Sequence, residues 1–321
     1  MFIRVHPRQG VPVADVVSPA DPRRAGSGRG RGLAEVPEPR RIPRRPPPRP
    51  PGPGRNLPPE LTQFFRANAI KNLYLTAELL RILRLLDAQG IRAVPLKGPA
   101  LAQSLYGDLA LREFCDLDVL VQETDLRKAR ELLEAQGYRL DFALDPRDEA
   151  AYVRNQQHYH LLHPAKGIVI ELHWCFAPRW FAFPLSPSQV WPRLQPMHLA
   201  GREVPSFCPE HLFLFLAAHG AKHRWCALKW LCDLAQLIHR HPRLDWEWIV
   251  DQARRSHAVR VLLLGIHLAA QLGAPVPPEL KERAQRDPKV QALAAGVWRD
   301  IENPASLRTP DLARAIRSNP D

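Results

Sequence analysis

The sequence lacks any apolar run long enough to cross a membrane. Among its 321 residues the longest apolar stretches, 212–218 and 261–270, are far shorter than the roughly 18 residues that a spanning helix needs. The first ten residues, MFIRVHPRQG, also lack the apolar stretch of a secretory signal. The five cysteines are never spaced as CxxC, which argues against a disulfide framework or a zinc ribbon. These absences predict a protein of a reducing, cytoplasmic compartment with no membrane partner.

Lysine is absent from residues 1–56, although this segment is strongly basic. It holds twelve arginines, four acidic residues and thirteen prolines, and so carries +8 of the net charge of +12. The rest of the chain is only mildly basic, so we do not expect it to bind nucleic acid. With few large apolar side chains, the segment is predicted to be a disordered tail. The alternatives are a proline-rich ligand for an SH3-like partner or an anionic surface, and an upstream stretch that is not translated.

From residue 57 onward the hydrophobic pattern predicts an α+β protein. Residues 57–180 follow the order helix, strand, helix, strand, helix, strand, helix, hairpin, which is typical of a small α/β domain with a mixed sheet. A connector rich in proline, tryptophan and serine then reaches about residue 204. Residues 181–301 are predicted to form a helical bundle domain, and the polar residues 302–321 a frayed tail.

The individual elements follow from apolar periodicity and turn residues. The expected strands cover 91–96, 117–121, 138–142, 158–162 and 168–174. The expected helices include a long one that ends near residue 90 and one that Thr124 caps and Gly137 ends. The others are expected at 100–106, 149–156, 210–223, 228–239, 246–256, 258–272, 278–285 and 290–301.

Two aspartates, Asp116 and Asp118, flank one leucine at the start of the strand 117–121. Alternate residues of a strand point to the same side, so we expect both carboxylates at one spot, where they repel each other unless a cation lies between them. Oxygen ligands at this spacing suit Mg²⁺, which completes its coordination with phosphate oxygens. The alternative is a pair of surface acids, because a DxD motif is weak evidence by itself.

Two other features strengthen the case for a phosphate-binding site. Lys97 and Gly98 lie at a strand-to-helix junction, where glycine lets the backbone approach a phosphate and lysine adds a mobile positive charge. An ordinary turn is the alternative. Glu171 lies within an apolar strand, where a charge is costly without a partner. A metal site shared with the two aspartates would supply one, and a solvent-facing position beside Val169 and His173 is the alternative.

These motifs resemble the uncharacterised bacterial nucleotidyltransferase family of the DNA polymerase β-like nucleotidyltransferase superfamily. The resemblance covers roughly residues 65–270, with the motifs in the same order and spacing. The positions that carry it are 96–101 (LKGPAL), 105–106 (LY), Arg112, 116–121 (DLDVLV), 132–133 (LL), 137–138 (GY), 171–174 (ELHW), 219–225 (HGAKHRW), 228–231 (LKWL) and 233–235 (DLA).

The resemblance implies transfer of NMP from an NTP, expected to be ATP, to a hydroxyl group. Asp116 and Asp118 would hold Mg²⁺, and Glu171 would help to bind a second metal and activate the acceptor. Lys97 and Gly98 stand where the superfamily has its glycine-serine phosphate loop. Here the sequence departs from the pattern, because Pro99 replaces the serine, so the lysine would have to replace the missing hydroxyl.

Arg112, His219, Lys222 and His223 are the other candidates for nucleotide binding. His219 and His223 are four residues apart in a predicted helix and therefore share a face. The resemblance favours a position on the cleft wall, in contact with nucleotide or acceptor. The alternatives are a polar helix end stacked on Trp225 and a zinc pair, although no HExxH glutamate accompanies them.

An acid in the last of the matching motifs, Asp233, lies in an apolar helix and needs a partner. We expect this partner to be Lys222, Lys229 or Arg224.

The sequence therefore predicts a nucleotidyltransferase whose site lies in the cleft between an α/β domain and a helical domain. The acceptor can be a small molecule, a peptide or a protein side chain, and nothing in the sequence selects among them. Two alternatives remain. One is an inactive relic of the same fold that binds nucleotide or regulates a partner. The other is a scaffold that binds partners through the proline- and arginine-rich tail.

Overall fold

The computed structural model describes residues 58–145, 147–178, 181 and 183–303. The predicted tails, 1–56 and 302–321, lie outside these residues apart from Glu302 and Asn303. The described residues all belong to one compact unit, Pro47–Asp321.

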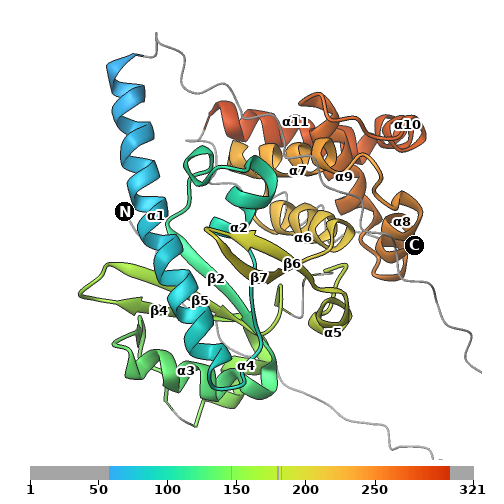
Figure 1. Ribbon diagram of the computed structural model, residues 1–321. Helices are drawn as coiled ribbons and strands as arrows, with labels where there is room; N and C mark the ends of the chain where they lie inside the picture. The colour runs from blue at the N-terminus through green and yellow to red at the C-terminus, as the bar shows by residue number, and fades with distance from the viewer. Residues whose placement is uncertain (1–57, 146, 179–180, 182, 304–321) are drawn as a thin grey trace, which may run out of the picture. The chain divides into compact units, whose positions relative to one another are not determined.

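Seven strands and eleven α-helices make up the described chain (Figure 1). The strands are β1 Ala93–Pro95, β2 Asp116–Val121, β3 Arg139–Leu140, β4 His158–His163, β5 Ile168–His173, β6 Gln195–Leu199 and β7 Arg202–Ser206. The helices are α1 Pro59–Asp87, α2 Pro99–Leu101, α3 Leu126–Ala135, α4 Glu149–Asn155, α5 Pro187–Val190, α6 Pro209–Lys222, α7 Leu228–Arg240, α8 Trp246–Arg255, α9 Val259–Gln271, α10 Pro278–Arg286 and α11 Pro288–Glu302. A π-helical segment, Ala102–Tyr106, continues α2.

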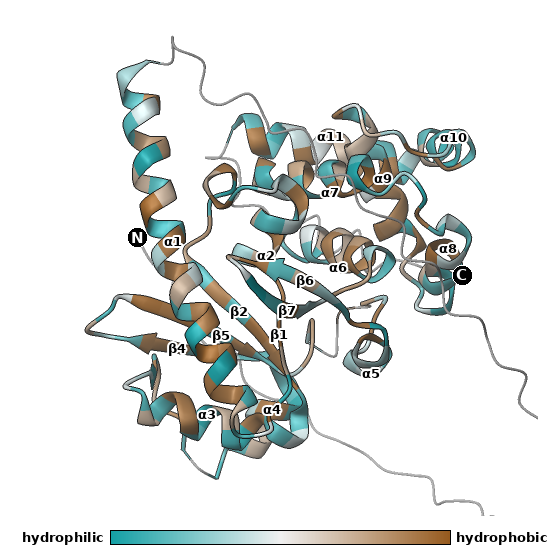
Figure 2. Ribbon diagram, viewed as in Figure 1, coloured by the Kyte–Doolittle hydropathy of each residue, from teal (hydrophilic) through white to brown (hydrophobic). Residues whose placement is uncertain are grey.

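The main sheet has five strands in the order β1-β2-β5-β4-β3. Only β2 and β5 pair in parallel, and the other pairs in this sheet are antiparallel. Both central strands are mainly apolar, as the brown colour in Figure 2 shows, and residues 117–121 of β2 are fully buried. A continuous apolar run of this kind suits a strand covered on both faces. The mixed sheet and the following helices confirm the predicted α+β class.

Helices cover the two faces of the sheet and form two hydrophobic cores. The first core packs α1 and α3 against the side of β2 and β5 that carries Leu117, Val119 and Ile170. The second packs Leu120 of β2 against α6, α7 and α9. Both halves of the chain contribute to this second core, so the sheet and the helices that follow it share buried apolar surface. None of the described helices is both long and apolar enough to cross a membrane.

A second sheet lies where the sequence predicts only a connector. Strands β6 and β7 form an antiparallel hairpin, and its turn residues, Ala200 and Gly201, have φ of 46° and 79°. Positive φ at both turn residues is the geometry of tight hairpins. The expectation of an irregular connector was wrong because Pro196 and Pro205, which weaken any strand signal, lie opposite each other in the hairpin.

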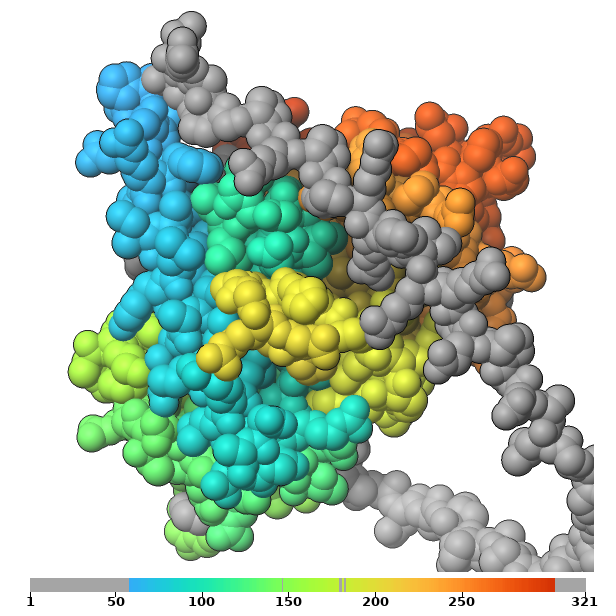
Figure 3. Space-filling model, in the orientation of Figure 1, coloured from blue at the N-terminus to red at the C-terminus, as the bar shows by residue number. Residues whose placement is uncertain are grey.

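The first half of α1 lies at the edge of the described chain, where Figure 3 shows it in blue. It leaves several large apolar side chains exposed, including Phe64 and Ile70. Two buried asparagines fasten it to the segment before β2. The Asn68 side-chain amide donates to the carbonyl oxygen of Ala110, and that of Asn72 donates to the carbonyl oxygen of Arg112. Helix α1 therefore positions the backbone of a candidate site residue.

Helix α6 ends in a tight turn that buries a tryptophan. Arg224 and Trp225 have φ of 59° and 51°, and the turn brings the Trp225 ring, which is fully buried, against Gly220. A β-carbon added at Gly220 would lie 2.4 Å from the nearest ring carbons. Only glycine fits at this position without a shift of the ring or the helix.

We predict that Gly220→Ala destabilises the protein, although alanine favours helix by about 1 kcal/mol relative to glycine. The clash with the enclosed Trp225 ring should dominate and lower the free energy of unfolding by roughly 1–3 kcal/mol, as measured by urea denaturation. In a Trp225→Leu background, which lacks the ring, the same step should cost much less. An equal cost in both backgrounds would show that the ring is not the cause.

Candidate active site

One cleft of the structure brings together all nine residues that the sequence analysis selected. They are Lys97, Gly98, Arg112, Asp116, Asp118, Glu171, His219, Lys222 and His223. The acids come from β2 and β5, and the His219, Lys222 and His223 group comes from α6 and the residue after it. Lys97 and Gly98 form the turn between β1 and α2, where Gly98 adopts φ of +56° close to the Asp116 carbonyl oxygen.

The parallel pairing of β2 with β5 sets the three acids side by side. Asp118 lies directly opposite Glu171 in the register, and Asp116 lies two residues before Asp118 on the same strand. Their side chains therefore share one face of the sheet. Glu171 lines the cleft, so the alternative of a solvent-facing glutamate away from the aspartates does not hold.

Two basic side chains lie against this acidic cluster. The Lys97 Nζ atom lies 2.7 Å from Asp118 Oδ1. The His173 Nε2 atom lies 3.2 Å from Asp118 Oδ1 and 3.2 Å from Glu171 Oε2. The second carboxylate oxygen of Asp118, Oδ2, is buried and has no hydrogen-bond partner in the part of the chain that the structure describes. An unpaired acceptor on a side chain that is only 1% exposed is a site that a cationic ligand would satisfy.

The pKa values on this side of the cleft follow from burial and from these contacts. Burial, with the Asp118 charge, raises the pKa of Asp116. Burial would also raise the pKa of Glu171, but the hydrogen bond from His173 and the charges of His173, His158 and Lys97 together outweigh burial and lower the pKa. For Lys97 burial favours the neutral form, yet the Asp118, Glu171 and Asp116 charges prevail and raise its pKa. The strand side of the cleft thus holds acids that are matched by cations.

On the helical side of the cleft, the pKa values of the basic groups are lowered. Burial, followed by repulsion from Lys97, lowers the pKa of Lys222 to about 8 and that of His219 well below its usual value. Burial and the Lys222 charge lower the pKa of His223 to about 4. These groups lie among other basic groups, so their charged forms are disfavoured until an anion enters.

His219 and His223 line the cleft, as the resemblance implies, and do not stack on Trp225 as one of the alternatives had it. Their ring centroids lie 5.4 and 5.3 Å from that of Trp230, the third residue of α7. Trp225 is instead enclosed against Gly220. In the described part of the chain no third metal-ligating side chain joins the histidine pair, so the zinc alternative gains no support.

Asp233 has a different partner from those expected. Arg112 donates from Nε and Nη2 to both carboxylate oxygens of Asp233 at 2.9–3.0 Å, and the Tyr106 hydroxyl donates to Oδ1 at 2.9 Å. Sequence proximity had suggested nearby basic residues, but the fold brings Arg112 to Asp233 from 121 positions away. Arg112 therefore lines the cleft while its guanidinium is held by an acid of α7.

Sequence reasoning assigned no role to two histidines that line the same cleft, His158 and His173. The sequence does contain information that places both histidines near Glu171. His173 lies two residues after Glu171 on the same strand and so shares its face, and the hairpin turn at 164–167 sets His158 opposite His173. The aromatic ring of Trp230 and the lysine before it also line the cleft. Both belong to the LKWL motif at 228–231, to which the sequence analysis assigned no role in the cleft.

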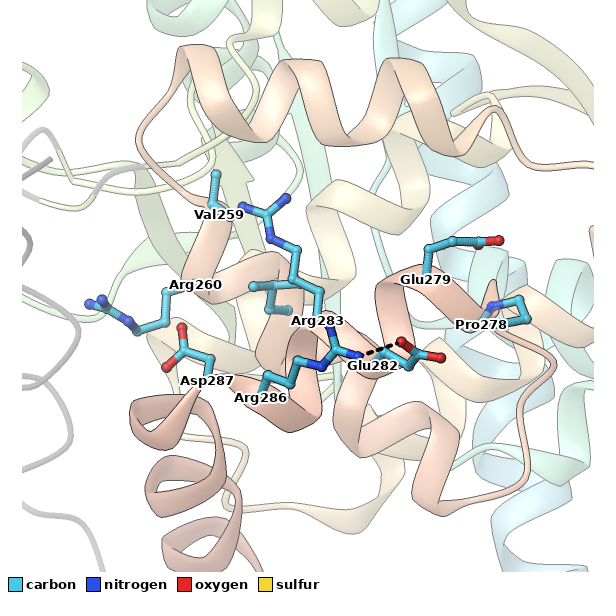
Figure 4. A pocket seen from close by; sticks show the side chains of 9 residues that line it. Val259, Arg260, Pro278, Glu279, Glu282, Arg283, Arg286 and Asp287 are labelled. Atoms are coloured by element: carbon cyan, nitrogen blue, oxygen red, sulfur yellow. Dashed lines mark hydrogen bonds and ion pairs between the residues drawn. The ribbon is translucent and has the colours of Figure 1, made fainter.

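A larger hollow lies among the last helices and does not have this chemistry (Figure 4). It measures about 690 Å³ against about 200 Å³ for the cleft, and α9, α10 and the start of α11 line it. Two of its three acids are engaged locally, because Glu282 pairs with Arg286 at 3.0 Å and Asp287 caps α11. Size alone therefore does not locate the candidate active site.

The chain is an α+β protein whose cleft has acids on the sheet and basic groups on the facing helices. The comparisons with known proteins identify the family to which such a chain belongs. Residues 49–274, more than two thirds of the chain, match the family described as uncharacterised nucleotidyltransferase. The chain belongs to this family, and is thereby assigned to the enzymes that transfer a nucleoside monophosphate. No curated protein sequence matches the chain significantly.

Some solved structures are also similar. A crystal structure of ANT(2″)-Ia in complex with adenylyl-2″-tobramycin shares 12% identity over 58% of this chain and 98% of that one, with a TM-score of 0.41. An antigenic nucleotidyltransferase-like protein from Paracoccidioides brasiliensis shares 16% identity over 77% of this chain and 92% of that one, with a TM-score of 0.33. The family assignment rests on the sequence match and not on these structures.

We predict that the buried ion pair between Arg112 and Asp233 is required for stability. Asp233→Asn leaves the Arg112 charge buried without its counterion, and should lower the free energy of unfolding by about 3–5 kcal/mol. Urea denaturation measures this loss. The double variant Arg112→Met, Asp233→Leu removes both charges and should be less destabilised than Asp233→Asn alone. If Asp233→Asn unfolds at the wild-type denaturant concentration, the pair does not stabilise the fold.

Proposed function

We propose that the cleft binds an NTP together with a divalent ion and transfers the NMP group to an acceptor hydroxyl. The observation that carries this proposal is the division of charge across the cleft. One side offers three carboxylates, and the other offers basic groups whose charged forms are disfavoured in the absence of an anion. A triphosphate with its metal ion complements both sides at once.

The acidic side fits a hard divalent ion, for which we propose Mg²⁺. Asp116, Asp118 and Glu171 are oxygen donors on one face of the sheet, and Asp118 Oδ2 is buried without a partner among the described residues. We assign Asp116 and Asp118 as the ligands, with Glu171 as a third. When bound, Mg²⁺ would neutralise phosphate oxygens and make the acceptor hydroxyl more acidic.

The basic side is proposed to hold the triphosphate. Lys97 is paired with Asp118 in the free protein, and we propose that it turns to a phosphate oxygen when the nucleotide enters. It would then supply the contact that the hydroxyl of the missing serine cannot make. His219, Lys222 and His223 would contact the remaining phosphates, and an incoming anion would favour their protonated forms. ATP is the proposed donor.

The chemical step follows from the acids. The acceptor oxygen forms a bond to the α-phosphorus, the bond to the β-phosphate oxygen breaks, and pyrophosphate leaves. Glu171, whose pKa is lowered by the hydrogen bond from His173, is ionised and is proposed to orient the acceptor hydroxyl. The hydroxyl proton passes to this carboxylate or to solvent. Arg112, whose guanidinium is held by Asp233, is proposed to contact the nucleotide and help to position it.

We also propose that two successive parts of the chain form separate domains with different roles. Residues 57–180 would act as the catalytic α/β domain and residues 181–301 as the helical domain that closes the cleft. The cleft takes its acids from the first of these and His219, Lys222 and His223 from the second.

We predict that Mg²⁺ with ATP stabilises the wild-type protein and that Asp118→Asn abolishes this effect. At a ligand concentration of 100 times Kd the stabilisation should be about 2.7 kcal/mol, which appears as an increase in Tm. Asp251→Asn is a matched control, because it also removes one carboxylate but lies on α8, outside the residues that line the cleft. Equal shifts in wild type and Asp118→Asn would exclude this metal site.

We predict a different effect for Glu171→Gln, which preserves shape but removes the charge. With labelled ATP, Mg²⁺ and a lysate as the source of acceptor, transfer should fall by a factor on the order of 10²–10⁴. The affinity for ATP, measured on the same preparations, should change far less. If ATP affinity falls as much as transfer does, Glu171 binds the nucleotide and does not act on the acceptor.

A further inference from the structure

Two histidines extend the acidic face of the sheet into a mixed set of nitrogen and oxygen donors. His173 lies two residues after Glu171 on β5, and His158 lies directly opposite His173 on β4. Asp118 lies opposite Glu171 on the other side, on β2. Three adjacent strands thus present imidazole and carboxylate groups to the same face and the same cleft.

The distances suit a single ion. One ligand atom from each of His158, Glu171 and His173 lies within 4.8 Å of the other two. His173 Nε2 and Glu171 Oε2 are 3.2 Å apart, and His158 Nε2 and Glu171 Oε1 are 3.8 Å apart. Ligands at about 2.0–2.1 Å from a tetrahedral ion are roughly 3.3 Å from one another, so small side-chain movements would bring these atoms into a first coordination shell.

Burial supports a ligand at this position. The His173 side chain is only 6% exposed and that of Asp118 only 1%. Asp118 lines the same cleft, yet its Oδ2 atom has no hydrogen-bond partner among the described residues. In addition, His173 Nε2 faces two carboxylates at once, at 3.2 Å each. A cation held among these atoms would give the free oxygen a partner and would take both the imidazole nitrogen and the carboxylates as ligands.

We propose that His158, Glu171 and His173, with Asp118 beside them, bind a divalent first-row transition-metal ion such as Co²⁺ or Zn²⁺. Imidazole nitrogen is a poor ligand for Mg²⁺ but a good one for these metals. This position differs from the all-oxygen position that we assign to Mg²⁺ by its two imidazole ligands, whereas Glu171 and Asp118 lie beside both positions. Any part of this histidine site in nucleotidyl transfer rests on the proposed function, whereas the binding of metal to the site does not.

The test is a titration of the metal-free, full-length protein with Co²⁺, followed by visible absorption, without nucleotide. The wild type should bind one Co²⁺ with the ligand-field bands of a site that contains nitrogen ligands. His158→Gln should weaken binding at least tenfold, and so should His173→Gln. Because His173 is buried, the partly exposed His158 provides the variant least prone to misfold, and Tm confirms folding in both.

His160→Gln is the matched control. His160 is the next histidine on the same face of β4, but it pairs with Asp141 at 2.8 Å and does not belong to the proposed ligand set. Co²⁺ affinity should be unchanged in this variant. Wild-type affinity in His158→Gln and His173→Gln, an equal loss in His160→Gln, or no Co²⁺ binding by the wild type would each overturn the proposal.

Asp116→Asn separates this proposal from the proposed function. The variant should still bind Co²⁺, while losing the increase in Tm given by Mg²⁺ with ATP. If Co²⁺ binding is lost in Asp116→Asn and retained in both histidine variants, the metal sits at the aspartate pair and the histidine site is wrong. If Co²⁺ binds as proposed but Mg²⁺ with ATP has no effect on the wild type, the metal site stands and the proposed nucleotide site fails.

Discussion

The parallel pairing of β2 with β5 is the constraint on which the rest of the structure depends. It is the one parallel pair of the main sheet, and it sets Asp118 directly opposite Glu171. Parallel strands need long crossovers, and here the crossover supplies α3, β3, α4 and β4 between the two strands. The pairing is covered by α1 and α3 on one face, and on the other face its acids line the cleft toward the later helices.

Three carboxylates in such a place need counterions, and the protein supplies them from within the sheet side of the cleft. Lys97 and His173 contact Asp118 at 2.7 and 3.2 Å, so two basic side chains lie against the acids in the free protein. The helical side has no such matching acids, and the lowered pKa values of His219, Lys222 and His223 express this deficit. The sheet side of the cleft thus carries acids that contact basic side chains, and the helical side carries basic groups whose pKa values are lowered.

The ion pair between Arg112 and Asp233 links the two halves of the chain at the edge of this cleft. Arg112 precedes β2, and its backbone carbonyl accepts from Asn72 of α1, while its guanidinium reaches an acid of α7. Both side chains are almost fully buried, so neither charge is tolerated without the other. One arginine thus connects the long first helix, the acidic strand and the helical wall, and it keeps the walls of the cleft in a fixed relation.

The sequence by itself determined the features that depend on near neighbours. It predicted the order of most strands and helices, the shared direction of Asp116 and Asp118 and the strand position of Glu171, because side-chain direction repeats every two residues in a strand and every 3.6 in a helix. The resemblance to the nucleotidyltransferase family, and not periodicity, added Arg112, His219, Lys222 and His223 to the expected site. Only the tertiary structure decided which strands and helices meet. It selected Arg112 as the partner of Asp233, Trp230 as the ring beside the α6 histidines, and His158 and His173 as neighbours of Glu171. It also formed the β6–β7 hairpin despite its prolines. Contacts between distant segments depend on register and packing across the whole chain, and no local pattern encodes them.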